Sequence, residues 1–200
     1  MKLVGMLDSP YVRRVAISLE LYGIDFEVQQ VSVLSTFAEF AAINPVVKAP
    51  TLVLDDATVL MDSTLILDYF EHLAPVERKL LPQQAQARAF DLRLIGLGLA
   101  ACEKTVSIVY EHRLRPAEKL HQPWLDRVTG QLLTAYSNLE KLLADRKDEP
   151  LTQASLTVAV AWSFTQYIMA DGVKAENFPN LQRLAQLAEQ HPAFLKYPIE

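Results

Sequence analysis

The sequence has almost no cysteine and no excess of positive charge. Its 200 residues include one cysteine, Cys102, which cannot form an intramolecular disulfide. The fold therefore does not depend on an oxidising compartment, and a cytoplasmic location is the simplest expectation. The formal net charge of −5 argues against non-specific binding to nucleic acid or to an anionic membrane, because both need clustered Lys and Arg.

A secretory signal, a metal-ligand spacing and a membrane-spanning segment are also missing from the pattern. The N-terminus has one lysine, a very short apolar run and then Asp8, which does not fit a secretory signal. The 4 histidines are scattered, without the spacing that a metal site needs. Residues 150–170 carry no charge and are long enough to span a bilayer, but they contain too many Ser, Thr and Gln side chains for lipid. We expect a helix buried among other helices there.

The composition itself is that of a globular chain. Half of the residues are hydrophobic and 22% are charged, which permits a core and excludes disorder. Charge is distributed unevenly: residues 1–75 hold four basic and ten acidic side chains, whereas residues 76–200 hold fifteen and fourteen. The length permits one large domain or two small ones, and the uneven charge indicates two parts of different composition.

Strands and helices alternate in the first part of the chain. Short apolar or alternating runs predict strands over residues 2–7, 25–33, 51–54 and 58–61. Helical spacing of apolar residues predicts helices over residues 11–22, 35–42 and 62–73. The order is βαβαββα, and the last two strands, residues 51–54 and 58–61, form a hairpin.

After residue 75 only helical periodicity is found. It predicts helices over residues 83–115, over 123–146, from 152 onward, and over 181–190. Prolines fall between these segments or at their starts, where they are tolerated. The sequence therefore predicts an α/β domain over residues 1–75, a linker over 76–83 and an all-helical domain over 84–200.

Polar residues gather on three loops that can meet at one edge of such a sheet. Ser9 stands at the start of the first helix, where backbone N–H groups and the positive end of the helix dipole meet. Ala49 precedes Pro50, whose peptide bond can be cis and can aim a backbone edge outward. Asp62 and Ser63 offer a carboxylate, a hydroxyl and more N–H groups at the start of another helix. A ligand with an anionic thiol, a peptide backbone and an α-amino acid end would match the three loops in order.

These motifs, in this order and spacing, resemble the cytosolic glutathione S-transferases, and most of all their small bacterial members. The resemblance covers essentially the whole chain. It implies an N-terminal thioredoxin-like βαβαββα domain followed by a C-terminal helical-bundle domain. It also implies glutathione as co-substrate without a metal, a role in detoxification, and a homodimer in which the long helix from Gln83 packs on its mate. The residues that carry it are 9–13, 44–52, 62–63 with Ile66 and Tyr69, and 151–152.

Carried over by position, the resemblance assigns the glutathione contacts. Ser9 becomes the catalytic hydroxyl that donates a hydrogen bond to the thiolate, and Ala49 the backbone partner of the cysteinyl unit. Asp62 and Ser63 are expected to hold the γ-glutamyl end, and Lys48 to reach the glycyl carboxylate. A free thiol of pKa about 8.5 is only a few per cent thiolate at pH 7, and lowering that pKa to about 6.5 stabilises the anion by roughly 2.7 kcal/mol. A hydroxyl donor together with a helix N-terminus can supply that much.

The sequence says less about the site of the second substrate than about the glutathione contacts. Helical spacing and analogy with the family suggest that Tyr11, Lys104, Ile108 and Glu111 line its site. The leading activity is a glutathione transferase that directs the thiolate at a small electrophile. A glutathione-dependent peroxide or disulfide reductase stays open, and so does a non-catalytic interaction or regulatory module on the same fold.

Several residues also have purely structural interpretations or depart from the family pattern. Ser9 is a good helix N-cap without any catalysis. Arg13 and Arg14 are predicted to be surface or inter-domain charges. In the buried helix, Ser155 stands where the family usually has Asp three residues after Thr152. Because serine brings no charge, the buried polar network there must be satisfied differently.

Overall fold

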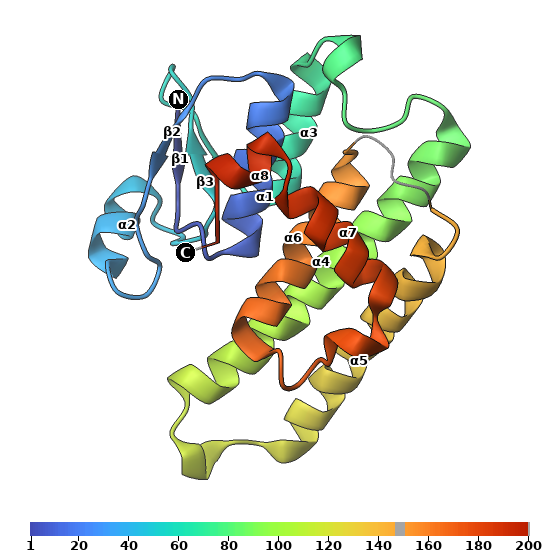
Figure 1. Ribbon diagram of the computed structural model, residues 1–200. Helices are drawn as coiled ribbons and strands as arrows, with labels where there is room; N and C mark the ends of the chain where they lie inside the picture. Colours follow the sequence, from blue (N-terminus) through green and yellow to red (C-terminus); the bar gives the residue numbers. More distant parts are fainter. Residues whose placement is uncertain (147–150, 200) are drawn as a thin grey trace. The chain divides into compact units, whose positions relative to one another are not determined.

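The computed structural model describes residues 1–146 and 151–199 and contains two compact units (Figure 1). Unit 1 comprises Met1–Pro82 and Gln190–Glu200, and unit 2 comprises Gln83–Glu189. The expected division assigns residues 84–200 to one helical domain, whereas the structure groups the C-terminal segment with the α/β part of the chain. Pro150, the first residue of the uncharged stretch, lies outside the described residues.

Unit 1 has the predicted order βαβαββα, and the thioredoxin-like fold is confirmed. Its four strands are arranged as β2-β1-β3-β4, with β1 and β2 parallel and the other neighbours antiparallel. Two short elements that the periodicity did not predict follow: the 3-10 helix η1 (Val76–Arg78) and helix α8 (Pro192–Lys196). The elements of the predicted order are β1 (Lys2–Val4), α1 (Pro10–Tyr22), β2 (Glu27–Gln29), α2 (Phe37–Ile43), β3 (Thr51–Val53), β4 (Val59–Met61) and α3 (Ser63–Leu73).

Helices cover both faces of this sheet. Successive side chains of each strand point to opposite faces, so both faces carry apolar residues. Leu3 pairs with Leu52 and both are fully buried, on the face that α1 and α3 cover (Figure 1). Val4 points to the opposite face, where it forms a buried cluster with Val31 and with Phe40 of α2. Helices on both faces leave the ends of the strands, and the loops that leave them, as the accessible part of the sheet.

Arg13 anchors the C-terminal segment to α1. Its side chain is buried, its Nε donates to the carbonyl oxygen of Tyr197 at 2.8 Å, and its guanidinium lies 5.2 Å from the centre of the Phe194 ring. At the surface, Lys196 Nζ donates to Glu20 at 2.7 Å, which raises the pKa of the lysine. Of the two predicted roles of Arg13, a surface charge or an inter-domain charge, the surface charge is therefore wrong.

Unit 2 is helical, as predicted. It contains α4 (Ala85–Leu114), α5 (Gln122–Leu143), α6 (Gln153–Met169) and α7 (Pro179–Glu189), with the 3-10 helices η2 (Ala117–Lys119) and η3 (Ala175–Asn177). Helix α6 is buried along most of its length, which confirms the interpretation of the uncharged stretch. Within the described residues, no helix is both long and apolar enough to cross a membrane.

An aromatic and hydroxyl cluster holds α6 against its neighbours. Trp162 packs edge-on against Tyr136 and Phe178, with ring centres 5.1 and 5.6 Å apart. The Tyr136 hydroxyl donates to the Ala161 carbonyl at 3.0 Å and bonds the Thr165 hydroxyl at 2.6 Å. Burial raises the pKa of Tyr136, so this hydroxyl keeps its proton as a donor.

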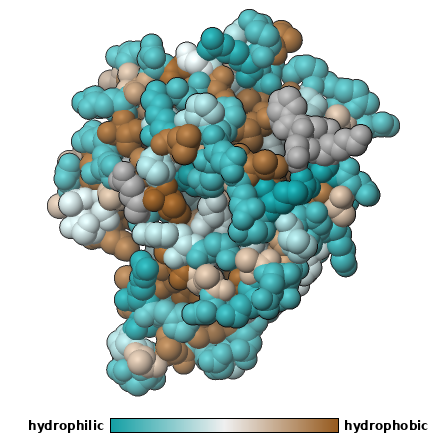
Figure 2. Space-filling model, viewed as in Figure 1, coloured by the Kyte–Doolittle hydropathy of each residue, from teal (hydrophilic) through white to brown (hydrophobic). Residues whose placement is uncertain are grey.

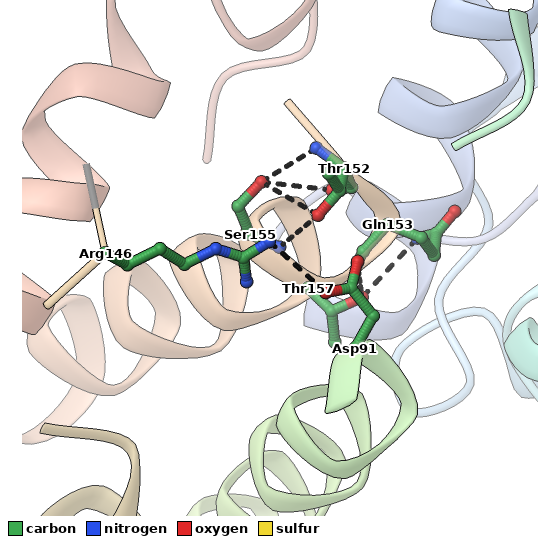
Figure 3. Close-up of polar contacts among 6 residues, drawn as sticks. All are labelled: Asp91, Arg146, Thr152, Gln153, Ser155 and Thr157. Carbon is green, nitrogen blue, oxygen red and sulfur yellow. Dashed lines mark hydrogen bonds and ion pairs between the residues drawn. The ribbon is translucent and has the colours of Figure 1, made fainter. Parts of the chain in front are cut away.

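The start of α6 shows how a serine replaces the family's usual aspartate. Thr152 and Ser155 form a capping box: the Ser155 N–H donates to Thr152 Oγ1 at 3.2 Å, and the Thr152 N–H donates to Ser155 Oγ at 2.9 Å. The Ser155 hydroxyl also donates to the Thr152 carbonyl at 3.2 Å. Figure 3 shows Arg146 and Asp91 beside this box, and Arg146 donates to Asp91 Oδ1 at 3.2 Å. A buried charge is present next to the box, but α4 supplies it and α6 does not.

Replacing Ser155 with Ala is expected to lower the free energy of unfolding by about 1 kcal/mol, because it removes half of the capping box. Urea unfolding followed by circular dichroism measures this change. Ser107→Ala is the matched control, since the Ser107 hydroxyl donates to the exposed Glu103 carbonyl one turn earlier in α4, away from the helix end. An equal loss in both variants would show that the Ser155 hydroxyl does not stabilise the helix end.

Candidate functional site

Contacts within unit 1 bring the three polar loops together. At Gly5 the backbone after β1 passes close to α1 and to the loop before β3: φ is 144°, and a Cβ would lie 2.5 Å from Val12 Cγ2 and 3.3 Å from Ala49 Cβ. Only glycine fits this position without displacing its neighbours. On the other side, Lys48 Nζ lies 3.7 Å from Asp62 Oδ2, and both side chains are about half exposed. The loops after β1, before β3 and before α3 therefore form one cluster.

Ser9 is the N-cap of α1. Its side-chain oxygen accepts a hydrogen bond from the Val12 N–H at 3.4 Å, so the structural interpretation of this residue is confirmed. The cap uses only the oxygen. In the described parts of the chain nothing accepts the hydroxyl hydrogen, and the residue is partly exposed. One serine can therefore cap the helix and donate a hydrogen bond to a ligand at the same time.

The loop before β3 is held from inside. Asn44 Nδ2 donates to Thr51 Oγ1 at 2.8 Å, and that hydroxyl donates to the Lys48 carbonyl at 2.8 Å. The Ala49-Pro50 peptide bond is cis. No residue in the described segments hydrogen-bonds the N–H or the carbonyl of Ala49, which lies outside strand β3. The N–H and the carbonyl of Ala49 therefore form a backbone edge to which a peptide ligand could hydrogen-bond.

Two non-glycine residues of these loops have a positive φ. Val47 has a φ of 53° and Asp62 a φ of 71°. Such conformations are uncommon for non-glycine residues, and they are most costly for a β-branched one such as valine. Val47 thus adopts a backbone that glycine would adopt freely. Strained residues of this kind gather at ligand sites, and here both lie beside the clustered loops.

Asp62 and Ser63 start α3 in different roles. Asp62 is the N-cap, and its Oδ1 accepts from the Thr64 N–H at 2.9 Å while Oδ2 faces Lys48. Ser63 is the first residue of the helix and is 3% exposed. Its Oγ accepts from Arg14 Nη1 at 3.1 Å. The helix start thus combines a carboxylate, a hydroxyl and the positive end of a helix dipole.

Arg14 is a residue of the site that the sequence argument missed. It is buried, with only 2% of its surface exposed, and donates from Nη1 to the hydroxyls of Ser63 and Thr64. Of the predicted surface or inter-domain charge, the surface alternative is therefore wrong here too. Its position on α1, five residues after the cap at Ser9, was the available clue.

The residues expected for a second substrate lie in both units. Tyr11 belongs to α1, whereas Lys104, Ile108 and Glu111 are on α4, at spacings that place them on one side of that helix. Ile108 and Glu111 are buried, and Glu111 Oε2 accepts from Arg115 Nε at 2.7 Å. Their role as a substrate site stays a prediction.

The residues that the structure describes include no candidate metal site. No group of three or more His, Cys, Asp or Glu side chains is placed there so that it could hold a metal ion. The chemistry available at the clustered loops is that of hydroxyl donors, one carboxylate, one ammonium group, a peptide edge and two helix N-termini.

Comparison with known proteins finds the same architecture over the whole chain. The family model for the N-terminal domain of glutathione S-transferases matches residues 3–79. Glutathione S-transferase 1 of Dianthus caryophyllus is 30% identical over 98% of this chain and 88% of its own length. The maleylacetoacetate isomerase of Pseudomonas aeruginosa is 26% identical over 97% of this chain and 93% of its own length.

A solved structure agrees with these relatives. A glutathione transferase family member from Pseudomonas fluorescens, crystallised with bound glutathione, is 28% identical and has a TM-score of 0.85. The match covers all of this chain and 98% of that one. Both units of the present chain therefore have counterparts in a single protein of known structure.

Proposed function

The chain belongs to the glutathione S-transferase family, and we propose that it is an enzyme that binds glutathione at the clustered loops and directs the thiolate at a small electrophile. Glutathione is the co-substrate in this family, and a related structure contains it. The observation that carries the proposal is the hydroxyl of Ser9. It caps α1 through its oxygen and keeps its hydrogen for a ligand, at the helix N-terminus where an anion is stabilised.

In this mechanism, Ser9 stabilises the anion and does not attack. The thiol of bound glutathione loses its proton to solvent, and the resulting thiolate accepts a hydrogen bond from the Ser9 hydroxyl. The sulfur then forms a bond to an electrophilic carbon. In a substitution the leaving group departs with the bonding electrons, and in an addition the new carbanion takes up a proton.

The remaining loops would hold the peptide. Ala49 offers its N–H and carbonyl to the cysteinyl unit, in the manner of an added strand. Asp62 would pair with the γ-glutamyl amino group, and Ser63 would donate to the adjacent carboxylate. Lys48 has to leave Asp62 in order to reach the glycyl carboxylate. Since the present pair is long and half exposed, exchanging it for ligand contacts costs little.

Calorimetric titration with glutathione tests the proposal. We expect saturable binding by the wild-type protein, followed by turnover of at least one substrate in a panel of electrophiles, peroxides and mixed disulfides. Conjugation identifies a transferase, and turnover of only peroxides or disulfides identifies a reductase. Absence of glutathione binding under several conditions would reject the enzyme and favour a non-catalytic interaction module.

A cytoplasmic location and a homodimer belong to the same proposal. The chain has one cysteine and needs no oxidising compartment, which favours the cytoplasm. Figure 2 shows hydrophobic residues scattered among hydrophilic ones on the face viewed there. The resemblance implies that the long helix from Gln83, α4, packs on its mate, and we add to that interface a row on α3 in which Leu65, Tyr69 and Leu73 are 66%, 41% and 55% exposed. Residues at this spacing lie along one side of a helix, and such a row is typical of an interface.

Replacing both Leu65 and Leu73 with Glu is expected to convert the dimer to a monomer, because paired charges at the centre of an apolar interface would lose their hydration. Light scattering after size exclusion measures the mass of each form. Leu195→Glu is the matched control, since Leu195 is also 66% exposed but lies on α8. A wild-type protein that is already monomeric, or a double variant that remains a dimer, would contradict the assigned interface.

A further inference from the structure

Arg14 lies against the start of α3, where the proposed site holds the γ-glutamyl end of glutathione. Its Nη1 donates to Ser63 Oγ at 3.1 Å and to Thr64 Oγ1 at 3.3 Å. Arg14 and Ser63 are 2% and 3% exposed, so their contact is protected from water. Thr64 is exposed and shares the same guanidinium nitrogen.

The Arg14 guanidinium determines whether the Ser63 hydroxyl can donate or accept hydrogen bonds. Because arginine has five N–H donors and no acceptor, Ser63 can only accept from it. The hydroxyl hydrogen must then point away from Arg14, and no residue in the described ranges accepts it. A hydroxyl whose oxygen is bound to a cation is also polarised, which strengthens the bond that it donates. The result is a fixed, strengthened donor at a helix N-terminus.

We infer that Arg14 is a positioning residue for glutathione. It orients and polarises the Ser63 hydroxyl toward the α-carboxylate of the γ-glutamyl group, and it does not touch the ligand itself. The inference rests on the proposed glutathione site. It adds to that site a buried cation whose effect is transmitted through one hydroxyl, and so it predicts which end of the ligand senses Arg14.

Two peptides separate this role from a general structural one. The first is glutathione, and the second is 4-aminobutyryl-cysteinyl-glycine, which is glutathione without the γ-glutamyl α-carboxylate. Calorimetry on the wild-type protein should show weaker binding of the second peptide by tenfold or more. In Arg14→Met we expect glutathione to bind about tenfold more weakly, the usual size of one charge-assisted hydrogen bond, and the second peptide to bind within about twofold of wild type.

The Ser63→Ala variant tests the route of the effect. If Arg14 acts through the Ser63 hydroxyl, the double variant binds glutathione within about twofold of Ser63→Ala alone. The matched control is Arg13→Met, which removes another buried arginine of α1 that bonds the C-terminal segment. This control should lower thermal stability while preserving the discrimination between the two peptides.

Each other outcome counts against the inference. Equal weakening of both peptides in Arg14→Met, or fully additive effects of Arg14→Met and Ser63→Ala, would make Arg14 a structural residue while leaving the glutathione site intact. A wild-type protein that binds glutathione but does not discriminate the peptides would move the α-carboxylate away from Ser63. A wild-type protein that binds neither peptide would reject the proposed function and the inference together. If Arg14→Met does not fold, Arg14→Gln, which removes the positive charge but keeps a polar side chain, replaces it, and discrimination equal to wild type in that variant overturns the inference.

Discussion

Replacing Ser9 with Ala is expected to slow conjugation by about 15-fold at pH 6.5 and by less than about 1.5-fold at pH 8.5. The difference follows from the thiolate population. The helix N-terminus remains in the variant and keeps part of the effect, so the pKa of bound glutathione rises from about 6.5 to about 8 and not to the free value of about 8.5. Half of the wild-type complex is then thiolate at pH 6.5, against roughly 3% in the variant. At pH 8.5 the wild-type complex is almost wholly thiolate and the variant is about three-quarters thiolate. The loss therefore shrinks as the pH rises.

The measurement is a pH profile of kcat/KM together with ultraviolet absorbance of the bound thiolate. Ser9→Thr retains the hydroxyl and should keep the low pKa of the ligand. Ser9→Gly is the control for the helix cap, because glycine at an N-cap costs only a few tenths of a kcal/mol, whereas alanine costs about 1 kcal/mol. If the Gly and Ala variants show the same bound-thiol pKa as wild type, Ser9 is a cap and another group stabilises the anion.

Local pattern determined most of what could be predicted here. The βαβαββα order and the four long helices follow from periodicity, and the loops that join them carry Ser9, Ala49 and Asp62, which the structure gathers in one cluster with Lys48 and Ser63. The ends of the elements were less predictable. The first strand stops at Val4 and not at residue 7, because Gly5 has a φ of 144° and turns the chain toward α1.

What could not be predicted depends on contacts between distant residues. Arg13 and Arg14 are adjacent basic residues near a helix start, a pattern that is typical of exposed charge. Their burial depends on the Tyr197 carbonyl, 184 residues away, and on the Ser63 hydroxyl, 49 residues away. Helix α8 was missed for the same reason, since five residues give no periodicity and the helix is held by its packing on α1.

Glu71 is the third example of a distant contact, and it explains the path of the expected linker. It is a buried residue of α3, 5% exposed, in a row that otherwise faces the core. Its Oε2 accepts from the Tyr22 hydroxyl at 2.9 Å and from the Leu80 N–H at 3.1 Å, while Oε1 accepts from the Leu81 N–H at 3.2 Å. One carboxylate thus ties the end of α1 and the chain after α3 to the same helix.

Replacing Glu71 with Ala is expected to lower the free energy of unfolding of unit 1 by about 3 kcal/mol. The variant removes the acceptor of three hydrogen bonds, two of them buried, and each of the two buried donors that loses this acceptor costs roughly 1–3 kcal/mol. The small side chain also leaves unfilled volume beside Tyr22. Urea unfolding of the full chain, followed by near-ultraviolet circular dichroism and by amide hydrogen exchange in α1 and α3, measures the change.

Two variants show whether the hydrogen bonds of Glu71, and not its charge, stabilise this corner. Asp68→Ala removes an exposed carboxylate from the same helix and should change the free energy of unfolding by less than about 0.5 kcal/mol. Glu71→Gln keeps one acceptor oxygen but directs an NH₂ group at a backbone donor, so its stability should lie between wild type and Glu71→Ala. If Glu71→Ala unfolds at the same urea concentration as Asp68→Ala, the three contacts contribute nothing measurable. The linker would then be held by its other contacts, among them the packing of Leu80, which is 8% exposed, and the hydrogen bond from Arg78 Nη1 to the Tyr22 carbonyl at 3.1 Å.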